Sequence, residues 1–417
     1  MSASQAATSV SPAADEPSRL ANASTFLVVG VLFTAITAAG AMFADGHRLA
    51  MSWLMAVVFW IAVSLGALVM VLLHHIFDAG WSTVIRRPLE HWIGVFPLLA
   101  GLFAPLVLLS LFGQHDLLWK WMDHEAVAGD ILWVKKSAFL NPTAFVVFNI
   151  LFFGAWIWVA GRLRKHSFAQ DDDGSVEHTL ANRKTAAFGI PLTALTLTFA
   201  AFYWLMSLEY HWFSTIYGVW FFATGMKAAL ALTVLICLYL VRKGVFVGIF
   251  QTGHLLNLGN ILLAFTVFWA YISFSQYFLI YNANVPEETF WYNLRELNLA
   301  SGERNSWWDV GLLLLFGNFF LPFFFFLGNA NKKKPARMVA ICVWILLIAF
   351  VDIAFNALPS IKQANGDAIP FGVTVFDVTA LVGIGALCFW SFFRSFARTR
   401  CIPIRDPRIV ESLHCHE

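Results

Sequence analysis

Residues 51–76 read MSWLMAVVFWIAVSLGALVMVLLHHI and contain no Asp, Glu, Lys or Arg. A helix needs about 20 apolar residues to cross the roughly 30 Å hydrocarbon layer of a bilayer, and this stretch is longer. Nine further stretches are similarly long and apolar, namely 24–44, 92–112, 142–163, 186–206, 217–241, 254–281, 307–328, 336–356 and 371–393. The sequence therefore predicts an all-α polytopic membrane protein with ten transmembrane helices.

The composition agrees with this class. Hydrophobic residues make up 59% of the chain and charged residues 12%, whereas a water-soluble domain has about 25% charged residues. Soluble enzymes, nucleic-acid-binding proteins and disordered proteins are thereby excluded. The net charge is only +2, which gives no reason to expect a nucleic acid or another polyanion as partner, and the lipid bilayer is the expected surroundings.

The distribution of Lys and Arg predicts the orientation. The side that carries the termini has 19 of these residues and the opposite side has 7. Because cytoplasmic loops carry the excess of positive charge, both termini are expected in the cytoplasm. The expected organisation is a disordered cytoplasmic tail (1–23), a membrane domain (24–393) and a cytoplasmic C-terminal tail (394–417).

An internal duplication is suggested by the helix order. Helices 2–5 and 6–9 form two four-helix bundles in this interpretation, flanked by helices 1 and 10. An offset of four helices preserves the orientation, so the bundles would be parallel repeats about an axis normal to the membrane. Each unit has a basic turn, then a histidine that opens the next helix (His91 and His254), then Leu-Leu-Ala at 98–100 and 262–264.

Lys227 lies in the middle of the sixth predicted helix. A charged group there is costly, which favours a functional role. The spacing i, i+4, i+7 places Trp220, Thr224 and Lys227 on one face. Two interpretations stay open: a proton-exchanging amine, and a structural ion pair between helices. The acids considered as partners are Glu209 first, and Asp352 or Asp377 as alternatives.

The corner between helices five and six reads SLEYHW at 207–212. The spacing places Ser207 and His211 as i, i+4 neighbours, with Glu209 on another side. A carboxylate and an imidazole at the membrane edge suit proton release from a quinol, because both can accept a proton near neutral pH. An interfacial girdle of aromatic residues is the alternative.

Helix seven carries a dense polar run. Its members considered as quinone ligands are Tyr271, Ser275, Gln276 and Tyr277, and Glu209 and His211 join them as candidates. Such hydroxyls and amides also make hydrogen bonds between membrane helices. Packing, a file of water molecules and a quinone headgroup site are therefore the three interpretations.

Other ionisable residues lie near both ends of the helices. Asp309, Asp352 and Asp377 come near the non-cytoplasmic ends of helices eight, nine and ten, and His74, Asp78, His91 and His254 lie on the cytoplasmic side. His74 and Asp78 have the spacing of a helix-terminal ion pair. Two ionisable vestibules with Lys227 between them predict proton movement more readily than carriage of a polar solute.

No resident metal or covalently bound cofactor is predicted. The five cysteines form neither a CxxC nor a CxxCH motif. The histidines lie at helix ends, whereas haem ligation needs facing histidines inside a bundle. The sequence His414–Cys415–His416 has three ligand types in a row, which we interpret as incidental.

Three longer stretches carry a family resemblance. LHHIFDAGWSTVIRRPLEHW (73–92), MSLEYHWFSTIYG (206–218) and FSQYFLIYNANVPEETFWYNLR (274–295) resemble the F subunit of bacterial alternative complex III. That subunit is described as quinone-binding subunit 2 of a quinol:cytochrome c oxidoreductase and belongs to the NrfD/PsrC-like membrane subunits. The resemblance extends over essentially the whole chain.

The resemblance implies a subunit of the bacterial inner membrane without a redox centre of its own. Its partners would be a second NrfD-like quinol-binding subunit, an Fe–S subunit, multihaem and monohaem cytochrome c subunits and a terminal oxidase. The complex would oxidise menaquinol or ubiquinol. In the family, the better-supported quinol pocket belongs to the sister subunit.

Three functional hypotheses follow. The first is an energy-coupling subunit that supports a quinone site and conducts protons. The second is a structural membrane anchor without a quinone or proton role. The third, an independent secondary transporter, is disfavoured because Pro97 and Pro105 in helix three have no counterpart in helix seven.

Overall fold

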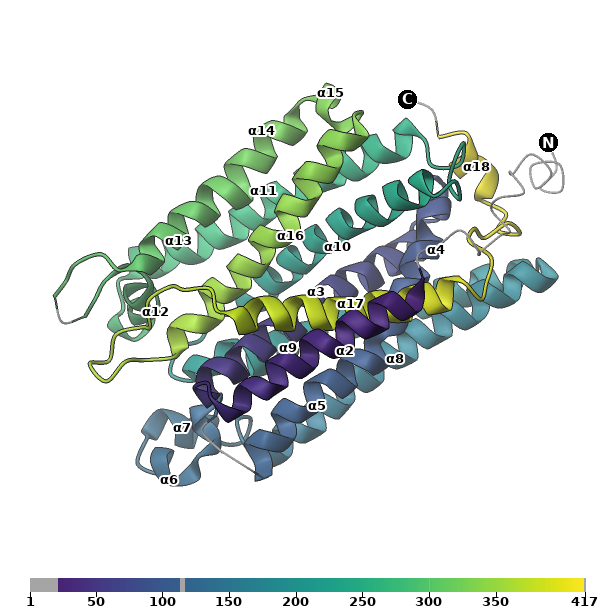
Figure 1. Cartoon of the computed structure of the whole chain (residues 1–417). Helices are drawn as coiled ribbons and strands as arrows, with labels where there is room; N and C mark the ends of the chain where they lie inside the picture. The colour runs from purple at the N-terminus through teal and green to yellow at the C-terminus, as the bar shows by residue number, and fades with distance from the viewer. Residues whose placement is uncertain (1–21, 113–116, 300, 416–417) are drawn as a thin grey trace.

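The computed structural model of the chain describes residues 22–112, 117–299 and 301–415, and it is all-α (Figure 1). Ten spans are long and apolar enough to cross a membrane, so the predicted class and helix count are confirmed. The helices that build them are α2 (Ala23–Ala39), α3 (Gly46–Ile76), α4 (Thr83–Trp92) with α5 (Phe96–Phe112), α8 (Pro142–Asp173), α9 (Val176–Trp204), α10 (Tyr217–Arg242), α11 (Thr252–Ala283), α13 (Ser306–Leu314) with α14 (Leu321–Leu327), α16 (Pro335–Ala357) and α17 (Val375–Phe396).

Short helices fill the connections between the spans. They are α6 (His124–Val127), α7 (Ile131–Lys136), α12 (Pro286–Glu296), α15 (Asn329–Lys332) and α18 (Ile409–Leu413). The predicted 1–23 tail lies almost wholly outside the described residues. The predicted 394–417 tail does not hang free: its described part returns to the bundle, where α18 packs against α4. Figure 1 shows the first residues of α2 and the short helix α18 toward the same end of the molecule.

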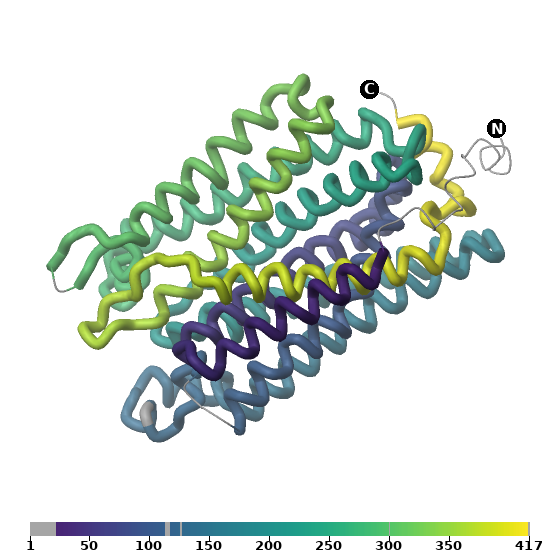
Figure 2. Tube along the Cα trace, viewed as in Figure 1, coloured from purple at the N-terminus to yellow at the C-terminus, as the bar shows by residue number. Residues whose placement is uncertain are grey.

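The two predicted four-helix bundles are present. In the first, α3, α5, α8 and α9 contact one another in a ring, and in the second, α10, α11, the α13–α14 span and α16 do the same. The first helices of the two bundles, α3 and α10, pack along the seam between them, as expected of two parallel units. Figure 2 traces this order, with the second bundle in green and the first in blue.

The two flanking helices, spans one and ten, lie side by side. Helices α2 and α17 pack against each other, and α17 also packs against α3, α4 and α5 (Figure 1). A hydrogen bond of 2.7 Å joins the Thr37 and Thr379 hydroxyls between them. Spans one and ten therefore flank the bundles as a pair that packs on the first bundle.

Several predicted helix boundaries need correction. Span four continues to Asp173 and does not end at residue 163, and span five begins at Val176 and not at residue 186. Span two begins at Gly46, not at residue 51, because the Asp45 side chain accepts from the first free amides of α3. Span three is preceded by the buried helix α4, whose arginines are neutralised by acids nearby. Span eight is interrupted by a π-helical segment, η8 (Leu315–Phe320).

The seam between the bundles depends on glycine. A Cβ at Gly225 of α10 would lie 2.6 Å from the carbonyl oxygen of Ala62 on α3. We expect Gly225→Ala to destabilise the protein by about 1–3 kcal/mol, because the two backbones must separate. Thermal unfolding in detergent, followed by the reactivity of the buried Cys237 and Cys342 thiols, measures this.

Gly154→Ala is the matched control for this prediction. Gly154 is also in a membrane helix, but a Cβ there would meet no atom within 4 Å. Since alanine favours a helix over glycine, this variant should be no less stable than the parent chain. Equal melting temperatures for the two variants would contradict the proposed role of Gly225.

Candidate functional site

A cavity of about 590 Å³ lies in the second bundle, between α11, α12, the α13–η8 segment and α16. Its volume is within the usual range for small-molecule sites. Phe274, Leu312 and Leu315 line it and are also exposed on the outer surface of the helices, so it reaches the lipid-facing side. Nearly half of its lining residues are aromatic, including Trp220, Trp269, Trp291, Tyr292, Trp307 and Phe355.

Asp352 is the acid at the inner part of this cavity. It belongs to α16 and is 2% exposed. Its carboxylate accepts hydrogen bonds from the Trp269 indole (2.9 Å), the Thr224 hydroxyl (2.9 Å) and the Trp220 indole (3.1 Å). Three donors compensate a buried acid without adding a charge. The carboxylate is thus held in place and still faces the cavity.

Lys227 lies one helical turn beyond Thr224 on the same face of α10. This confirms that Trp220, Thr224 and Lys227 share a face. The ammonium donates to the Asn318 side chain at 2.6 Å and to the Asn318 main-chain carbonyl. It also lies 5.6 Å from the centre of the Trp269 ring, whose indole donates to Asp352. Trp269 therefore contacts both ionisable groups.

Lys227 binds Asn318 and forms an ion pair with none of the three acids that were considered as its partners. None of the ion pairs among the described residues includes Lys227. Glu209 pairs with Lys362 at 3.1 Å, and Asp377 pairs with Arg48 at 2.5 Å. Glu209 and Asp377 are wrong as partners, and Asp352 is a neighbour through Trp269.

Asn318 is the residue that sequence reasoning missed. It sits inside the π-helical segment η8, and single π-turns in helices often mark functional sites. An asparagine in the middle of an apolar span is itself a signal, because its amide needs a partner in lipid. What the sequence does not show is that the widened turn aims both Asn318 oxygens at Lys227.

Arg295 and Glu296 line the outer part of the cavity, at the end of α12. The Arg295 guanidinium is 1% exposed and donates to the carbonyls of Trp291, Phe355 and Asn356 at 2.7–2.9 Å. Burial lowers the pKa of Arg295 to about 9. Burial also raises the pKa of Glu296, which accepts from the Tyr281 hydroxyl at 2.6 Å. A carboxyl group in this state can hold a proton more readily than one in water.

The polar run on helix seven divides into two sets. Gln276 and Tyr277 line the cavity, and the Gln276 amide donates to the Tyr292 hydroxyl at 3.3 Å. Tyr271 is 64% exposed on the outer face of α11, and neither it nor Ser275 lines the cavity. Of the four residues of helix seven that were predicted as quinone ligands, two therefore line the cavity and two lie outside it.

Glu209 and His211 lie outside the cavity as well. Helix α9 ends at Trp204, and a 3₁₀ turn (Met206–Glu209) follows it. The prediction that Ser207 and His211 are i, i+4 neighbours on one helix is therefore wrong. The His211 imidazole instead pairs with Asp130 in the α6–α7 connection. Hydrogen bonds from His211 and Tyr210 hold the pKa of Asp130 below its usual range.

Asp377 and Asp309 have different surroundings. Asp377 caps α17 and accepts from Arg48 and from Ser52, the latter at 2.7 Å, so it joins α17 to α3. Asp309 lies in the exposed first turn of α13 and does not line the cavity. Both sit on the same side of the molecule as the cavity mouth, but the structure does not bring them to Lys227.

The remaining four candidates, on the side of the molecule that carries α18, are His74, Asp78, His91 and His254. They contact the C-terminal segment or residues next to it. His74 contacts Ser82 at 2.7 Å and Arg86 at 3.1 Å, whereas Asp78 pairs with Arg408 and Arg183. The predicted His74–Asp78 ion pair is therefore wrong, because Asp78 follows the end of α3 with φ of 50° and turns away.

His91 and His254 complete this set. The His91 ring nitrogens contact Ser395 at 2.8 Å and Thr399 at 2.9 Å. His254 closes the N-terminal capping box of α11 and contacts Ser412 at 3.1 Å. These contacts serve the attachment of the C-terminal segment, and a role in proton transfer stays a prediction.

Among residues 22–112, 117–299 and 301–415, no group of three His, Cys, Asp or Glu side chains is placed to hold a metal ion. Four of the five cysteines are buried and none forms a disulfide in the described part of the chain. His416 of the His-Cys-His sequence lies outside that part. The chemistry that these side chains can support is hydrogen bonding and proton transfer.

The chain matches no protein-family model and no curated protein. The functional argument therefore rests on the geometry of the aromatic cavity, which Asp352 lines at its inner end, and on Lys227, which lies behind the cavity-lining Trp269.

Proposed function

We propose that this chain is a membrane subunit of a respiratory quinol:cytochrome c oxidoreductase of the alternative complex III type, in which it binds a quinone and conducts protons. The observation that carries this proposal is a lipid-accessible aromatic cavity that is lined by the buried acid Asp352 and by Trp269, whose ring lies 5.6 Å from the ammonium of the buried Lys227. The proposal also draws on the resemblance of three sequence stretches to the F subunit of that complex.

The shape and lining of the cavity suit a menaquinone or ubiquinone headgroup. Flat rings bind between aromatic side chains, which the tryptophans here provide. The carbonyl oxygens of a quinone can accept hydrogen bonds from the Gln276 amide and the Tyr277 hydroxyl, and a hydroxyl of the quinol can donate to the Asp352 carboxylate. An apolar tail can leave through the lipid-facing side beside Phe274 and Leu315. Most ligand pockets combine such an apolar wall with a few polar groups.

The proton role follows from the same geometry. Oxidation of a quinol to a quinone releases two protons and two electrons, and the electrons must leave to a partner with a redox centre. Asp352 can accept a proton at the inner end, and Glu296 can accept one near the mouth. Lys227, linked to Asp352 through Trp269, extends the route toward the middle of the bundle.

A photoreactive quinone tests the binding part of the proposal. In membranes that contain the whole complex, we expect it to label this chain on α11 or α16, near Gln276 and Asp352. Excess unlabelled menaquinone should compete. Labelling confined to the sister NrfD-like subunit would contradict a quinone site here and favour the structural anchor.

Gentle solubilisation tests the assembly part. We expect this chain to co-purify with an Fe–S subunit, cytochrome c subunits and a second NrfD-like subunit. Recovery of the chain alone, from membranes where those proteins are present, would contradict membership of such a complex.

We further propose that the chain lies in a bacterial inner membrane with both termini in the cytoplasm. The Lys and Arg distribution supports this orientation. A reporter that is active only in the cytoplasm should work when fused after Glu417 and should fail when inserted near Gly302. The opposite pattern would reverse the orientation and place the cavity mouth on the cytoplasmic side.

A further inference from the structure

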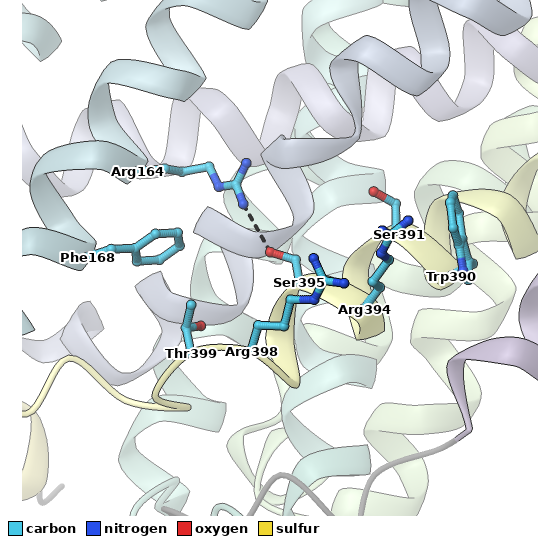
Figure 3. A pocket seen from close by; sticks show the side chains of 8 residues that line it. All are labelled: Arg164, Phe168, Trp390, Ser391, Arg394, Ser395, Arg398 and Thr399. Carbon is cyan, nitrogen blue, oxygen red and sulfur yellow. Dashed lines mark hydrogen bonds between the residues drawn. The ribbon is translucent and has the colours of Figure 1, made fainter.

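A second pocket lies in the first bundle, on the terminal side of the molecule and far along the sequence from the aromatic cavity's residues. It is a groove of about 350 Å³ between α8 and the end of α17. Figure 3 shows Arg164 and Phe168 on α8, with Ser395, Arg394 and Arg398 on and just after α17. Nothing in the proposed quinone or proton role uses this groove.

The groove is strongly positive. Its lining includes Arg164, Arg394 and Arg398 and no acidic residue. None of the ion pairs among the described residues involves these three arginines. Glu90, whose field reaches Arg164, is already paired with Arg86 and Arg87. Within residues 22–112, 117–299 and 301–415, no acid therefore pairs with the arginines at the groove.

The floor of the groove is ordered by hydrogen bonds. One Arg164 nitrogen donates to the Ser395 hydroxyl at 3.0 Å, shown as the dashed line in Figure 3. Ser395 also contacts His91, whose other ring nitrogen contacts Thr399 at 2.9 Å. The Nε of Arg164 is buried and has no acceptor among the described residues. A guanidinium fixed this way, with donors to spare, is suited to the oxygens of a phosphate.

The groove lies where a membrane helix leaves the bilayer. Trp390 lines it and sits one turn before Arg394, whose guanidinium lies 5.3 Å from the centre of the indole ring. Tryptophan is enriched at the headgroup level of membranes. The apolar part of α17 comes before Trp390 and the arginines follow it. The charged groups are thus at the depth of lipid phosphates.

An exposed face of α5 that could contact an acyl chain begins near the Arg164 guanidinium. A Cβ at Gly94 would lie 2.5 Å from an Arg164 nitrogen, so α5 begins directly beside the groove. Below Gly94, the exposed residues Pro97, Gly101 and Pro105 follow at helical spacing on one face of α5. A Cβ at Gly101 would meet no atom within 4 Å. This strip leads from the headgroup level into the apolar depth of the helices.

We infer that this groove is a binding site for an anionic phospholipid, whose phosphodiester lies among Arg164, Arg394 and Arg398 and whose acyl chain runs along the Pro97–Pro105 face of α5. Basic pockets between membrane helices bind such headgroups. The occupant is a lipid and not a free phosphate, because the exposed apolar face of α5 begins near Gly94, beside the Arg164 guanidinium that lines the pocket.

Native mass spectrometry of the complex that contains this chain tests the inference. The probes are dioleoylphosphatidylglycerol, dioleoylphosphatidylcholine and inorganic phosphate, each added to the same detergent micelles. We expect one phosphatidylglycerol to be retained in preference to phosphatidylcholine. The variant Arg394→Gln/Arg398→Gln should bind it about 30-fold more weakly, since each cation near an anionic lipid contributes to the affinity.

The matched control is Arg242→Gln/Lys243→Gln. These two exposed cations lie at the end of α10 on the same side, and Lys243 contacts the Tyr239 ring as Arg394 contacts Trp390. The control removes the same charge away from the groove and should leave phosphatidylglycerol binding unchanged. An equal loss in both variants would show a general charge effect and overturn the site.

A second variant tests the acyl-chain strip and does not touch the arginines. Gly101→Leu fills the open strip and should weaken phosphatidylglycerol binding. Inorganic phosphate should bind weakly to the parent chain and equally to this variant. Equal affinity for inorganic phosphate and phosphatidylglycerol in the parent chain would make the groove a free-anion site. Unchanged phosphatidylglycerol binding in both the Arg394/Arg398 and the Gly101 variants would overturn the lipid site.

Discussion

Replacement of Lys227 by methionine is expected to lower the number of protons moved per electron, while the complex still assembles and still reduces cytochrome c. Methionine nearly keeps the length and the apolar stem of lysine, and it removes the group that can carry a proton. Lys227 is the ionisable residue that follows Asp352 toward the middle of the bundle, with Trp269 in contact with both. Without it, a proton taken up by Asp352 has no basic group to continue to.

The measurement is the ratio of protons to electrons in liposomes that contain the purified complex. Lys332→Met is a close control. Lys332 is also buried, at 3% exposure, and its ammonium donates to the Asn260 side chain at 2.5 Å, much as Lys227 donates to Asn318. It sits in α15 and does not line the cavity. We expect the control to keep the full ratio.

Each other outcome has a defined meaning. Failure of Lys227→Met to assemble, with Lys332→Met assembling, would make Lys227 a structural donor to the π-helical segment. The unpaired Asn318 oxygens would then account for the loss, at about 1–3 kcal/mol. Unchanged assembly, turnover and proton ratio would exclude Lys227 from the route.

Asp352→Asn is expected to reduce quinol-dependent reduction of cytochrome c by about a hundredfold, because a general base contributes at least that much to a proton-transfer step. Asparagine has nearly the same shape, so the cavity should persist. The Trp220, Trp269 and Thr224 donors can still reach its one carbonyl oxygen. Photoreactive quinone should continue to label the cavity, which separates a loss of chemistry from a loss of binding.

Asp309→Asn is the control for this substitution. Asp309 is an exposed acid on the same side, at the start of α13, and it does not line the cavity. Its replacement should leave turnover unchanged. Wild-type turnover in Asp352→Asn would mean that quinol is oxidised elsewhere in the complex and that this cavity has at most a binding role.

The helices were predictable because each depends on its own sequence. Spans such as 51–76 are apolar over their full length, and lipid leaves a helix as the stable way to pair their backbone groups. The shared face of Trp220, Thr224 and Lys227 was predictable for the same reason, since helical spacing fixes it. The cavity itself was not, because it is formed by side chains from α10, α11, α12, the α13–η8 segment and α16, and helical spacing does not specify how separate helices pack.

The wrong predictions have two causes. The helical spacings His74–Asp78 and Ser207–His211 fail because α3 ends at Ile76 and α9 at Trp204. The other wrong partners lie across the fold. Glu209 looked near Lys227 because the two residues flank one corner, but Glu209 pairs with Lys362, which is 153 positions away. His211 pairs with Asp130, which lies in the α6–α7 connection, where no helix was predicted from the sequence. In the sequence, Arg295 was used only in the count of Lys and Arg that predicts the orientation. In the structure it is buried and lines the cavity. Sequence spacing specifies neighbours along a helix and leaves neighbours between helices open.

The buried ion pair between Arg86 and Asp406 joins α4 to the C-terminal segment. It therefore cannot form until the ribosome has synthesised the end of the chain. The two residues are 320 positions apart. At about 5–20 residues per second, a ribosome needs roughly 15–60 s to reach Asp406 after it has made Arg86. During that interval Arg86 has only Glu90 as a buried ion-pair partner. A nascent chain that stalls before Asp406 therefore keeps an incompletely neutralised arginine between its helices, and only a chain made through Asp406 can complete the neutralisation.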